Sequence, residues 1–304
     1  MEKNNDSNKF SSGISIGLPV YNGEKFLEKR IKGILNQTFQ DFEIIISNNA
    51  STDATEKICL EMQKQDSRIT YHKQSTNIGG MSNFDYVLQN AKREFFVWAA
   101  VDDEWDSKFL EKNFEFLVKN KEFVGSVSKE DFIKSNEDEK KIVNTRKKIR
   151  EKLYSKRPNL YPIKGNYSKK IKDILKSKSS NMIYGVMRTQ FLQKSMINER
   201  FLGDEWPIMF NIVKYGSYNE FPEKMLLRRE HGESWQGILY LAKKFNRNSL
   251  GMIFPNYPLT SWCIRNLESS VFLKNLDQMV MLNFEAGLGV IFEILLIIKN
   301  KITK

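Results

Sequence analysis

The first hundred residues alternate between strand-like and helix-like patterns, and this alternation restricts the fold more than any other feature. Short apolar runs rich in β-branched residues are separated by segments whose apolar residues recur at helical spacing. The expected strands are 14–21, 42–49, 68–74 and 94–100, and the expected helices are 23–37, 51–65 and 80–92. Alternation at this pitch predicts an α/β fold with a mostly parallel sheet and helices on both faces.

The fourth expected strand runs directly into a group of acids. The stretch "EFFVWAAVDDEWDSKFL" (94–110) begins as a buried strand and continues with Asp102, Asp103, Glu104 and Asp106. In open α/β sheets, ligands bind outside the carboxyl ends of the strands. Two adjacent carboxylates at that place can hold Mg²⁺ or Mn²⁺ together with substrate phosphates. A cap for the following helix is the alternative interpretation of the pair. Glu104 and Asp106 are expected to be acids at the start of that helix, favoured by the helix dipole and by capping.

Two common nucleotide-binding motifs are missing from the sequence. The first expected strand is not followed by G-x-G-x-x-G, so a nicotinamide dinucleotide fold has no support. No G-x-x-x-x-G-K-[ST] sequence is present either, which excludes a P-loop NTPase. A nucleotide diphosphate held through a metal ion is the interpretation that remains.

Positive charge is concentrated in one segment. Residues 140–178 contain 15 Lys or Arg against two acids, a net charge of +13, so the rest of the chain sums to about −2 of the total +11. Such a block could face an anionic membrane, nucleic acid or a phosphate-bearing substrate, or be a solvated insertion. We expect a cytoplasmic protein, because the polar start has no apolar signal core and the two cysteines, Cys59 and Cys263, fit a reducing compartment.

Seven stretches of the chain, in this order and spacing, resemble the family 2 glycosyltransferases of the GT-A fold. They are "ISIGLPVYNGEKFL", "IIISNNASTDAT", "NIGGMSNF", "FFVWAAVDDEWDSKFL", "NMIYGVMRTQFL", "FLGDEWPIMFNIVKYG" and "FPEKMLLRREHGES". The resemblance implies a metal-dependent, inverting transfer of a sugar from a nucleotide-sugar donor. It places the transferase domain at 13–235, with a nucleotide-binding half at 13–106 and an acceptor half at 107–235, and leaves 236–304 as a helical C-terminal region.

The resemblance also assigns residues to the nucleotide. This set is Pro19, Tyr21, Asn22, Asn48, Asn77 and Asn83. Asn48 stands where the family commonly has an Asp that contacts the base, and its carbonyl can still accept from the N3–H of uracil. A UDP-sugar is therefore the expected donor, with other nucleotides left open. Packing of Tyr21, a turn at Asn77 and a helix-surface amide at Asn83 are the structural alternatives.

By the same resemblance, Asp103 binds the metal and Asp102 binds the ribose or the metal. The chain has Ala-Val-Asp-Asp where many members have Asp-x-Asp-Asp. His231 matches a position that ligates the metal or touches the donor diphosphate, with a structural histidine as the alternative. Arg228 and Arg229 lie close to it in sequence and would neutralise phosphate charge.

Inverting transfer needs a base that removes the proton of the acceptor hydroxyl. The stretch "LGDEWP" offers Asp204 and Glu205 just before an apolar helix, and Asp204 aligns best with the family's base. Helix capping by Asp204 is the alternative. The resemblance implies that acceptor contacts lie between the acid motif and the base, so 165–185 is expected to border the acceptor site, and its basic residues suit a lipid-diphosphate acceptor. The resemblance thus implies transfer to a saccharide or lipid-linked saccharide in cell-surface polysaccharide biosynthesis.

The end of the chain, "AGLGVIFEILLIIKNKITK", has an apolar run of about 13 residues that Glu293 interrupts, short of the ~20 that a spanning helix needs. A core-packing helix and an interfacial anchor are both consistent with it. With the basic segment 140–178, it predicts peripheral attachment to the anionic inner leaflet of the membrane.

Two other function classes remain as alternatives. A nucleotidyltransferase on a similar scaffold also uses paired acids and a metal, but "PVYNGEKF" is not the Gly- and Lys/Arg-rich triphosphate loop that such an enzyme typically has. A non-catalytic, basic nucleic-acid-binding protein would rest on 140–178, where aromatic interleaving is thin. We therefore expect no nucleic-acid partner.

Overall fold

The computed structural model describes residues 10–133, 160–177, 181–229, 237–245 and 249–302. The chain divides into two compact units. The first comprises Met1–Phe132, Asn181–Lys194 and Tyr215–Arg229, and the second comprises Ile133–Ser180, Ser195–Lys214 and Glu230–Lys304. The predicted domain boundary near residue 235 stays a prediction.

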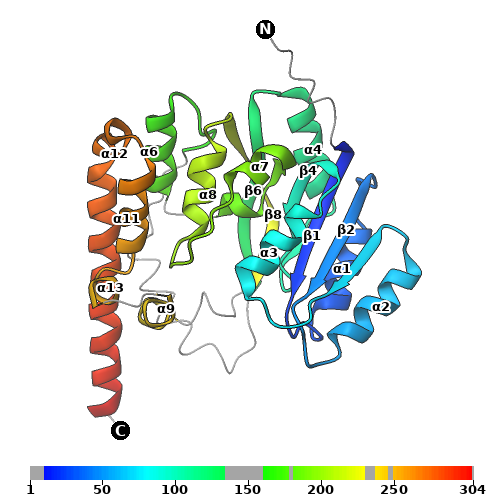
Figure 1. Cartoon of the computed structure of the whole chain (residues 1–304), viewed down its shortest axis with the longest axis horizontal. Helices are drawn as coiled ribbons and strands as arrows, with labels where there is room; N and C mark the ends of the chain where they lie inside the picture. The colour runs from blue at the N-terminus through cyan, green and yellow to red at the C-terminus, as the bar shows by residue number, and fades with distance from the viewer. Residues whose placement is uncertain (1–9, 134–159, 178–180, 230–236, 246–248, 303–304) are drawn as a thin grey trace. The chain divides into compact units, whose positions relative to one another are not determined.

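The first unit is built on one mixed sheet (Figure 1), which has eight strands among the described residues in the order β3-β2-β1-β4-β7-β6-β8-β5. These strands are β1 (Ser11–Val20), β2 (Phe42–Asn48), β3 (Ile69–Lys73), β4 (Arg93–Trp98), β5 (Glu104–Trp105), β6 (Phe123–Ile133), β7 (Val186–Arg188) and β8 (Ser217–Arg229). The pairs β1–β2, β2–β3 and β1–β4 are parallel, whereas β4–β7, β6–β7 and β5–β8 are antiparallel. The predicted parallel half is confirmed, and an antiparallel half extends it.

Helices cover both faces of this sheet, as predicted. The helical segments of this part are α1 (Leu27–Leu35), α2 (Thr55–Gln65), α3 (Gly80–Gln89), α4 (Phe109–Lys119), η2 (Asn181–Tyr184) and α7 (Thr189–Ser195). Alternate β1 residues such as Ile16 and Leu18 enter a core with residues of α1, α2 and α4. On the other face, a Cβ at Gly17 would lie 2.5 Å from Phe96 and 2.6 Å from Val87 of α3. Only glycine lets α3 approach β1 this closely.

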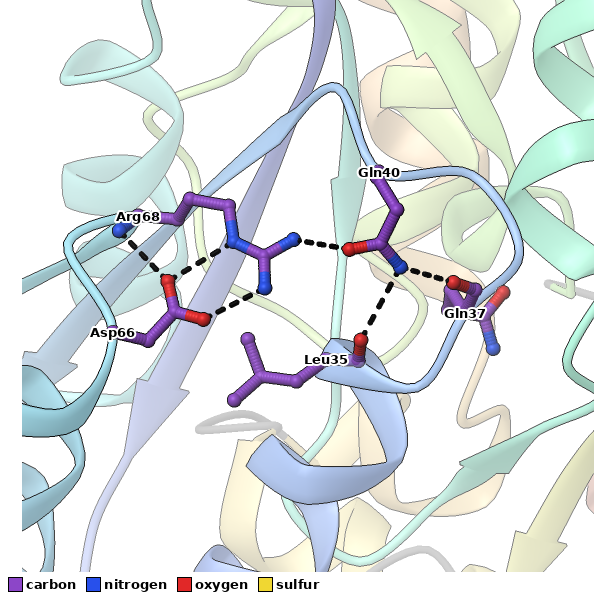
Figure 2. A network of polar contacts seen from close by, with 5 residues as sticks. All are labelled: Leu35, Gln37, Gln40, Asp66 and Arg68. Carbon is purple, nitrogen blue, oxygen red and sulfur yellow. Dashed lines mark hydrogen bonds and ion pairs between the residues drawn. The ribbon is translucent and has the colours of Figure 1, made fainter.

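The loops at the amino ends of the strands are tied together by one arginine (Figure 2). Arg68 forms a two-pronged ion pair with Asp66, with Nε 3.0 Å from Oδ1 and Nη2 2.7 Å from Oδ2. Its Nη1 donates to Oε1 of Gln40 at 2.6 Å, and the Gln40 amide donates to the backbone carbonyls of Leu35 and Gln37. The network therefore fixes the turns before β2 and β3 at the amino edge of the sheet. Ligands of open α/β sheets bind at the opposite, carboxyl edge.

The second unit is helical in its described part. Its helices are α6 (Tyr167–Ser177), α8 (Glu205–Ile212), α9 (Ile238–Phe245), α10 (Ser249–Ile253), α11 (Tyr257–Asn266), α12 (Ser269–Lys274) and α13 (Leu276–Ile302). The buried Lys170 of α6 donates to the backbone carbonyl of Val213 at 2.9 Å, directly after α8. The predicted helical C-terminal region is confirmed.

The terminal helix differs from the prediction in length. The sequence pattern predicted an apolar run too short to span a membrane, whereas α13 is 27 residues long. Among the described residues it is the one helix long and apolar enough to cross a bilayer by length and composition, over Leu276–Lys299, and 28% of its most apolar 18 residues are buried in the protein. The prediction failed because Glu293 does not interrupt the helix: its carboxylate accepts the backbone N–H groups of Ile238 and Leu239, both at 3.0 Å.

Candidate functional site

The loop after β1 is fastened to the loop after β2. Asn22 has a φ of 49°, and its Oδ1 accepts the backbone N–H of Thr52 at 2.9 Å. Its own N–H donates to the hydroxyl of Ser51 at 2.9 Å. Pro19 is buried, whereas the Tyr21 ring is 50% exposed, so packing does not account for Tyr21. An exposed ring on a fastened loop at the carboxyl edge is available for stacking on a flat ligand.

Two of the predicted nucleotide-contacting amides are buried and already hydrogen-bonded. Asn48 at the end of β2 donates to the Tyr71 hydroxyl at 3.0 Å, and its Oδ1 accepts the N–H of Ser51 at 3.0 Å. Asn83 of α3 donates to the backbone carbonyl of Ser47 at 2.9 Å and accepts from its hydroxyl at 2.6 Å. Asn83 is thus a tie between helix and strand rather than a helix-surface amide.

Asn77 belongs to a link that the sequence did not predict. Its Oδ1 accepts from the amide of the buried Asn49 at 3.0 Å and from the N–H of Gly79 at 2.9 Å. Asn49 in turn accepts the N–H of Ile78 at 2.8 Å and donates its own N–H to the carbonyl of Val20 at 2.8 Å. Asn49 therefore joins β1, β2 and the loop before α3, and the repeated Asn in "SNNAS" was its only sequence signal.

Asp103 is the buried member of the acid pair. Its Oδ1 accepts the backbone N–H of Arg229 at 3.3 Å, and its Oδ2 lies 3.8 Å from Nε of Arg228. Burial raises the pKa of Asp103 to about 6; Arg228 acts against this rise, and Asp102 adds to it. Among the described residues, its side chain bonds to the distant backbone of β8 and makes no capping hydrogen bond to α4, which favours a site residue over a helix cap.

The other acids have separate partners. Glu104 pairs with the guanidinium of Arg229 at 3.1 Å and with Lys29, so it is not a helix-start acid as expected. Asp106 accepts the N–H of Lys108 at 2.9 Å, a local turn bond at the start of α4 that agrees with its predicted capping role. The carbonyl of Asp102 lies 3.4 Å from Nε of Arg229.

Arg228 lies between two carboxylates and an aromatic ring. Its Nη1 is 3.2 Å from Glu130, and its guanidinium carbon is 4.8 Å from the centre of the Tyr184 ring. The Arg229 guanidinium likewise lies 4.8 Å from the centre of the Phe26 ring. Both cations are thus beside the acid pair, where they can balance an anionic ligand.

A third arginine at this place was not predicted. Arg30 of α1 is buried, with its guanidinium carbon 3.9 Å from the centre of the Trp105 ring. Among the described residues, its Nε and Nη2 have no hydrogen-bond partner. Burial lowers its pKa to about 10, against the attraction of Asp103, Asp102 and Glu104. Its position in the sequence could have predicted its burial. Arg30 follows Leu27 by three residues and precedes Ile34 by four, so it lies within the apolar stripe of the helix.

The donor set of the acid pair fits a hard divalent cation. Oδ2 of Asp103 faces Arg228 at a distance longer than a hydrogen bond, and burial of the carboxylate disfavours its charge until a cation is close. Within the described part of the chain, no group of three or more His, Cys, Asp or Glu side chains could hold a metal. Phosphate oxygens would thus supply the remaining ligands, the usual arrangement for Mg²⁺. His231, the third predicted ligand, lies outside the described residues.

The predicted base belongs to the second unit. Asp204 precedes α8, is 8% exposed, and among the described residues its side chain makes no capping hydrogen bond to the helix. Burial raises its pKa to about 7; Glu205 adds to the rise, and Arg200 opposes it. A carboxylate that titrates near neutral pH, and does not cap its helix, has the properties of a general base.

Comparison with known proteins identifies the family. The model of glycosyl transferase family 2 matches residues 15–175, more than half of the chain. The GalNAc(5)-diNAcBac-PP-undecaprenol beta-1,3-glucosyltransferase of Campylobacter jejuni is 29% identical over 206 residues, 67% of this chain and 61% of that protein. The putative teichuronic acid biosynthesis glycosyltransferase TuaG of Bacillus subtilis is 30% identical over 105 residues, 34% of this chain and 42% of TuaG.

Solved structures agree on the fold. Residues 1–349 of S. aureus TarS align with a TM-score of 0.55 at 13% identity, covering 89% of this chain and 80% of that one. The mannosyltransferase PcManGT of Pyrobaculum calidifontis, in complex with GDP-Man and Mn²⁺, aligns with a TM-score of 0.56 at 13% identity, covering 92% and 73%. The chain therefore belongs to glycosyl transferase family 2 and has the GT-A fold, and it spans 61% or less of the length of the first curated relatives that it matches.

Proposed function

We propose that this glycosyltransferase moves a sugar, with inversion, from a nucleotide-sugar donor to a saccharide or lipid-linked saccharide acceptor in cell-surface polysaccharide biosynthesis. The observation that carries the proposal is Asp103, a buried carboxylate at the carboxyl edge of the sheet with two arginines beside it. Carboxylate and guanidinium groups at one place match a diphosphate that is bound through a cation.

Asp103 and Asp102 would hold Mg²⁺ or Mn²⁺, and His231 remains a proposed third ligand. The bound cation would stabilise the charge that develops on the diphosphate leaving group. Arg228 and Arg229 are proposed to neutralise the outer phosphate oxygens, which requires Arg228 to turn from the carboxylates that it now contacts. Solved neighbours support the chemistry: one holds Mn²⁺ with GDP-Man, and another is TarS with UDP-GlcNAc.

The nucleoside would bind across the loops after β1 and β2. Tyr21 is the proposed stacking residue, with Pro19 and Asn22 shaping its loop. Oδ1 of Asn48 accepts the N–H of Ser51 through one lone pair, so its second lone pair would accept a hydrogen bond from the base. Asn77 and Asn83 would support these loops. A UDP-sugar is the proposed donor, on the analogy of TarS, whose structures hold UDP-GlcNAc or UDP.

Asp204 is the proposed base. As the acceptor oxygen attacks the anomeric carbon, Asp204 takes the hydroxyl proton, the new glycosidic bond forms, and the bond to the diphosphate breaks on the opposite face of the sugar. Its raised pKa makes the carboxylate a competent acceptor of this proton near neutral pH. Glu205 is the alternative base.

The acceptor and the cellular location complete the proposal. The C. jejuni relative is named for a transfer to a PP-undecaprenol-linked saccharide, and TuaG for teichuronic acid biosynthesis. We place the enzyme in the cytoplasm, peripheral to the inner leaflet. Of the basic segment 140–178, residues 140–159 lie outside the described residues. In the described rest, Lys169 and Lys172 already pair with Asp173 and Asp277.

Screening nucleotide sugars for slow hydrolysis with Mn²⁺ tests the proposal. We expect one UDP-sugar to release UDP faster than the GDP-, TDP- and CMP-sugars, and chelation of the metal to stop the release. Hydrolysis of nucleoside triphosphates alone, or release that is indifferent to chelation, would contradict the proposed chemistry.

A further inference from the structure

One face of α13 is apolar over most of its length. From residue 278 to residue 298 of this described helix, every exposed side chain is apolar. These side chains are Val280, Met281, Phe284, Leu288, Ile291, Phe292, Ile294, Leu295, Ile297 and Ile298. At 1.5 Å per residue, the face from Val280 to Ile298 is about 27 Å long. Soluble proteins rarely leave so large a continuous apolar patch in water.

The charged side chains of this stretch lie away from the apolar face. Glu293 is half-buried and accepts the first N–H groups of α9, and Glu285 is also half-buried. The exposed charges on α13 come at its ends, with Asp277 paired to Lys172 and Lys299 close to the C-terminus. Lys274, the last residue of α12, is exposed immediately before the face begins. The face is thus free of charge, and Lys274 and Lys299 lie beyond its two ends.

Two helices beside α13 also expose apolar side chains. Gly287 of α13 lies against Ile253 and Phe254, where a Cβ would be 3.1 Å from the Ile253 carbonyl oxygen. Ile253 and Phe254 themselves are exposed, as are Leu250 of α10 and Tyr240 of α9. Lys243 and Lys244 are also exposed, in the last turn of α9. Apolar side chains with lysines at the border match the acyl chains and anionic headgroups of a lipid bilayer.

The opposite face of α13 is built into the protein. Met279, Ala286 and Val290 are buried, and α13 packs on α6, α9 and α12. Figure 1 shows α13 as one long unbroken helix with α6 beside it. A spanning orientation would have to strip this face from its neighbours and move Glu293 from its capping bonds into hydrocarbon, which is costly. The packing therefore favours a helix that lies in the membrane plane.

We infer that the exposed face of α13, with the adjoining end of α10, is a membrane-binding surface that rests in the headgroup–acyl boundary of an anionic bilayer. A second copy of the chain fits this face less well. A paired helix would use a narrow apolar seam flanked by charged positions, whereas the positions beside Phe284 and Ile291 are themselves apolar across a wide arc. The inference is independent of the proposed donor, acceptor and metal.

Flotation of the full chain with vesicles of phosphatidylcholine and phosphatidylglycerol tests the surface. The test variant is the double change Ile291→Glu and Leu295→Glu, on side chains that are 55% and 58% exposed. The matched control is Val118→Glu, a 48% exposed apolar residue on α4 in the first unit. We expect the wild type and the control to float, and the partition coefficient of the double variant to fall at least about tenfold.

Two further measurements keep the result decisive. Alkaline carbonate should release the wild type from the vesicles, since a helix held at the interface is extracted far more readily than a helix that spans the bilayer. The far-ultraviolet circular dichroism spectrum and the midpoint of thermal unfolding should be the same in all three proteins, which separates loss of membrane binding from loss of the folded state. Equal flotation of the double variant overturns the inference. So does retention after carbonate, or a wild-type dimer that the double variant converts to monomer without any vesicle binding.

Discussion

The backbone N–H of Arg229 lies 3.3 Å from Oδ1 of Asp103, so the end of β8 is tied to the carboxylate that follows β4. The two residues are 126 positions apart in sequence, and the side chain of Arg229 extends the tie to Glu104. One strand thus brings two cations, Arg228 and Arg229, to the acid pair. This arrangement sets the charge balance on which the proposed donor site depends.

Asp204→Asn should lower the transfer rate by about 10²–10⁴-fold, because the amide keeps the shape of the side chain but cannot accept the hydroxyl proton. UDP affinity should not change. Steady-state kinetics on the identified donor, with calorimetry on UDP, measures both. Glu205→Gln is the matched control on the neighbouring acid, and an inactive Glu205→Gln beside an active Asp204→Asn would move the base to Glu205.

The transfer rate of the wild type should rise with pH through about 7, since Asp204 acts only when ionised and burial raises its pKa to about 7. This increase in rate reflects proton transfer to Asp204 in the chemical step. It should therefore appear in kcat at saturating donor and acceptor. A kcat that is flat between pH 5.5 and 8.5, in a buffer series of constant ionic strength, would exclude Asp204 as the group that titrates.

The raised pKa of Asp204 also predicts how the free energy of unfolding depends on pH. A carboxyl whose folded pKa is raised stabilises the protein below its unfolded pKa, and this contribution is lost as pH rises through the folded value. The pKa of Asp204 rises from the ordinary carboxyl value of 3.8 to about 7, so the loss of stability amounts to as much as about 4 kcal/mol. Asp204→Asn, which cannot ionise, should therefore gain unfolding free energy relative to the wild type between pH 4 and 7.5.

Urea unfolding at several pH values, without metal or donor, measures this difference. Asp66→Asn is the control of opposite sign, because Arg68 holds the pKa of Asp66 below its usual range. The wild-type advantage over Asp66→Asn should shrink as the pH falls. A pH-independent difference between wild type and Asp204→Asn would mean that Asp204 is not buried as described.

Gly17→Ala should destabilise the protein by about 1–3 kcal/mol, because the added methyl group overlaps Phe96 and Val87 between β1 and α3. Gly33→Ala is its matched control: Gly33 lies within α1, and a Cβ there meets nothing within 4 Å. That change should stabilise by about 0.5–1 kcal/mol through helix propensity and the unfolded state. Chemical denaturation that gave both variants the same sign would contradict the packing described for α3.

The parallel half of the sheet was predictable because its elements are long and locally patterned. β1, β2 and β4 are buried apolar runs, and the helices between them carry regular apolar stripes. β7 and β5 have three and two residues, too few for any periodicity, and their partners are distant in sequence. Such strands exist only through long-range pairing, which local patterns do not encode.

In the candidate site, too, local sequence predicted some residues and missed those whose role depends on contacts distant in sequence. Asp103 and Asp204 follow recognisable local stretches, and both are buried with raised pKa values. Arg30 and Asn49 were missed because their importance lies in what folds around them: the Trp105 ring for one, the loop at Asn77 for the other. The length of α13 was missed because Glu293, a break by composition, is an inward-facing cap of α9.

Calorimetric titration of UDP in the presence of Mn²⁺ tests the donor site most directly, with wild type, Asp103→Asn and Asp106→Asn compared. Asp106 is the matched control, since it is an acid of the same loop whose bond is to the local turn at Lys108. Removal of the buried metal-binding carboxylate should weaken UDP–Mn²⁺ affinity at least about a hundredfold, as loss of a charged ligand costs several kcal/mol, while Asp106→Asn retains wild-type affinity. Unchanged affinity in a folded Asp103→Asn protein would contradict the assignment of Asp103 to the metal.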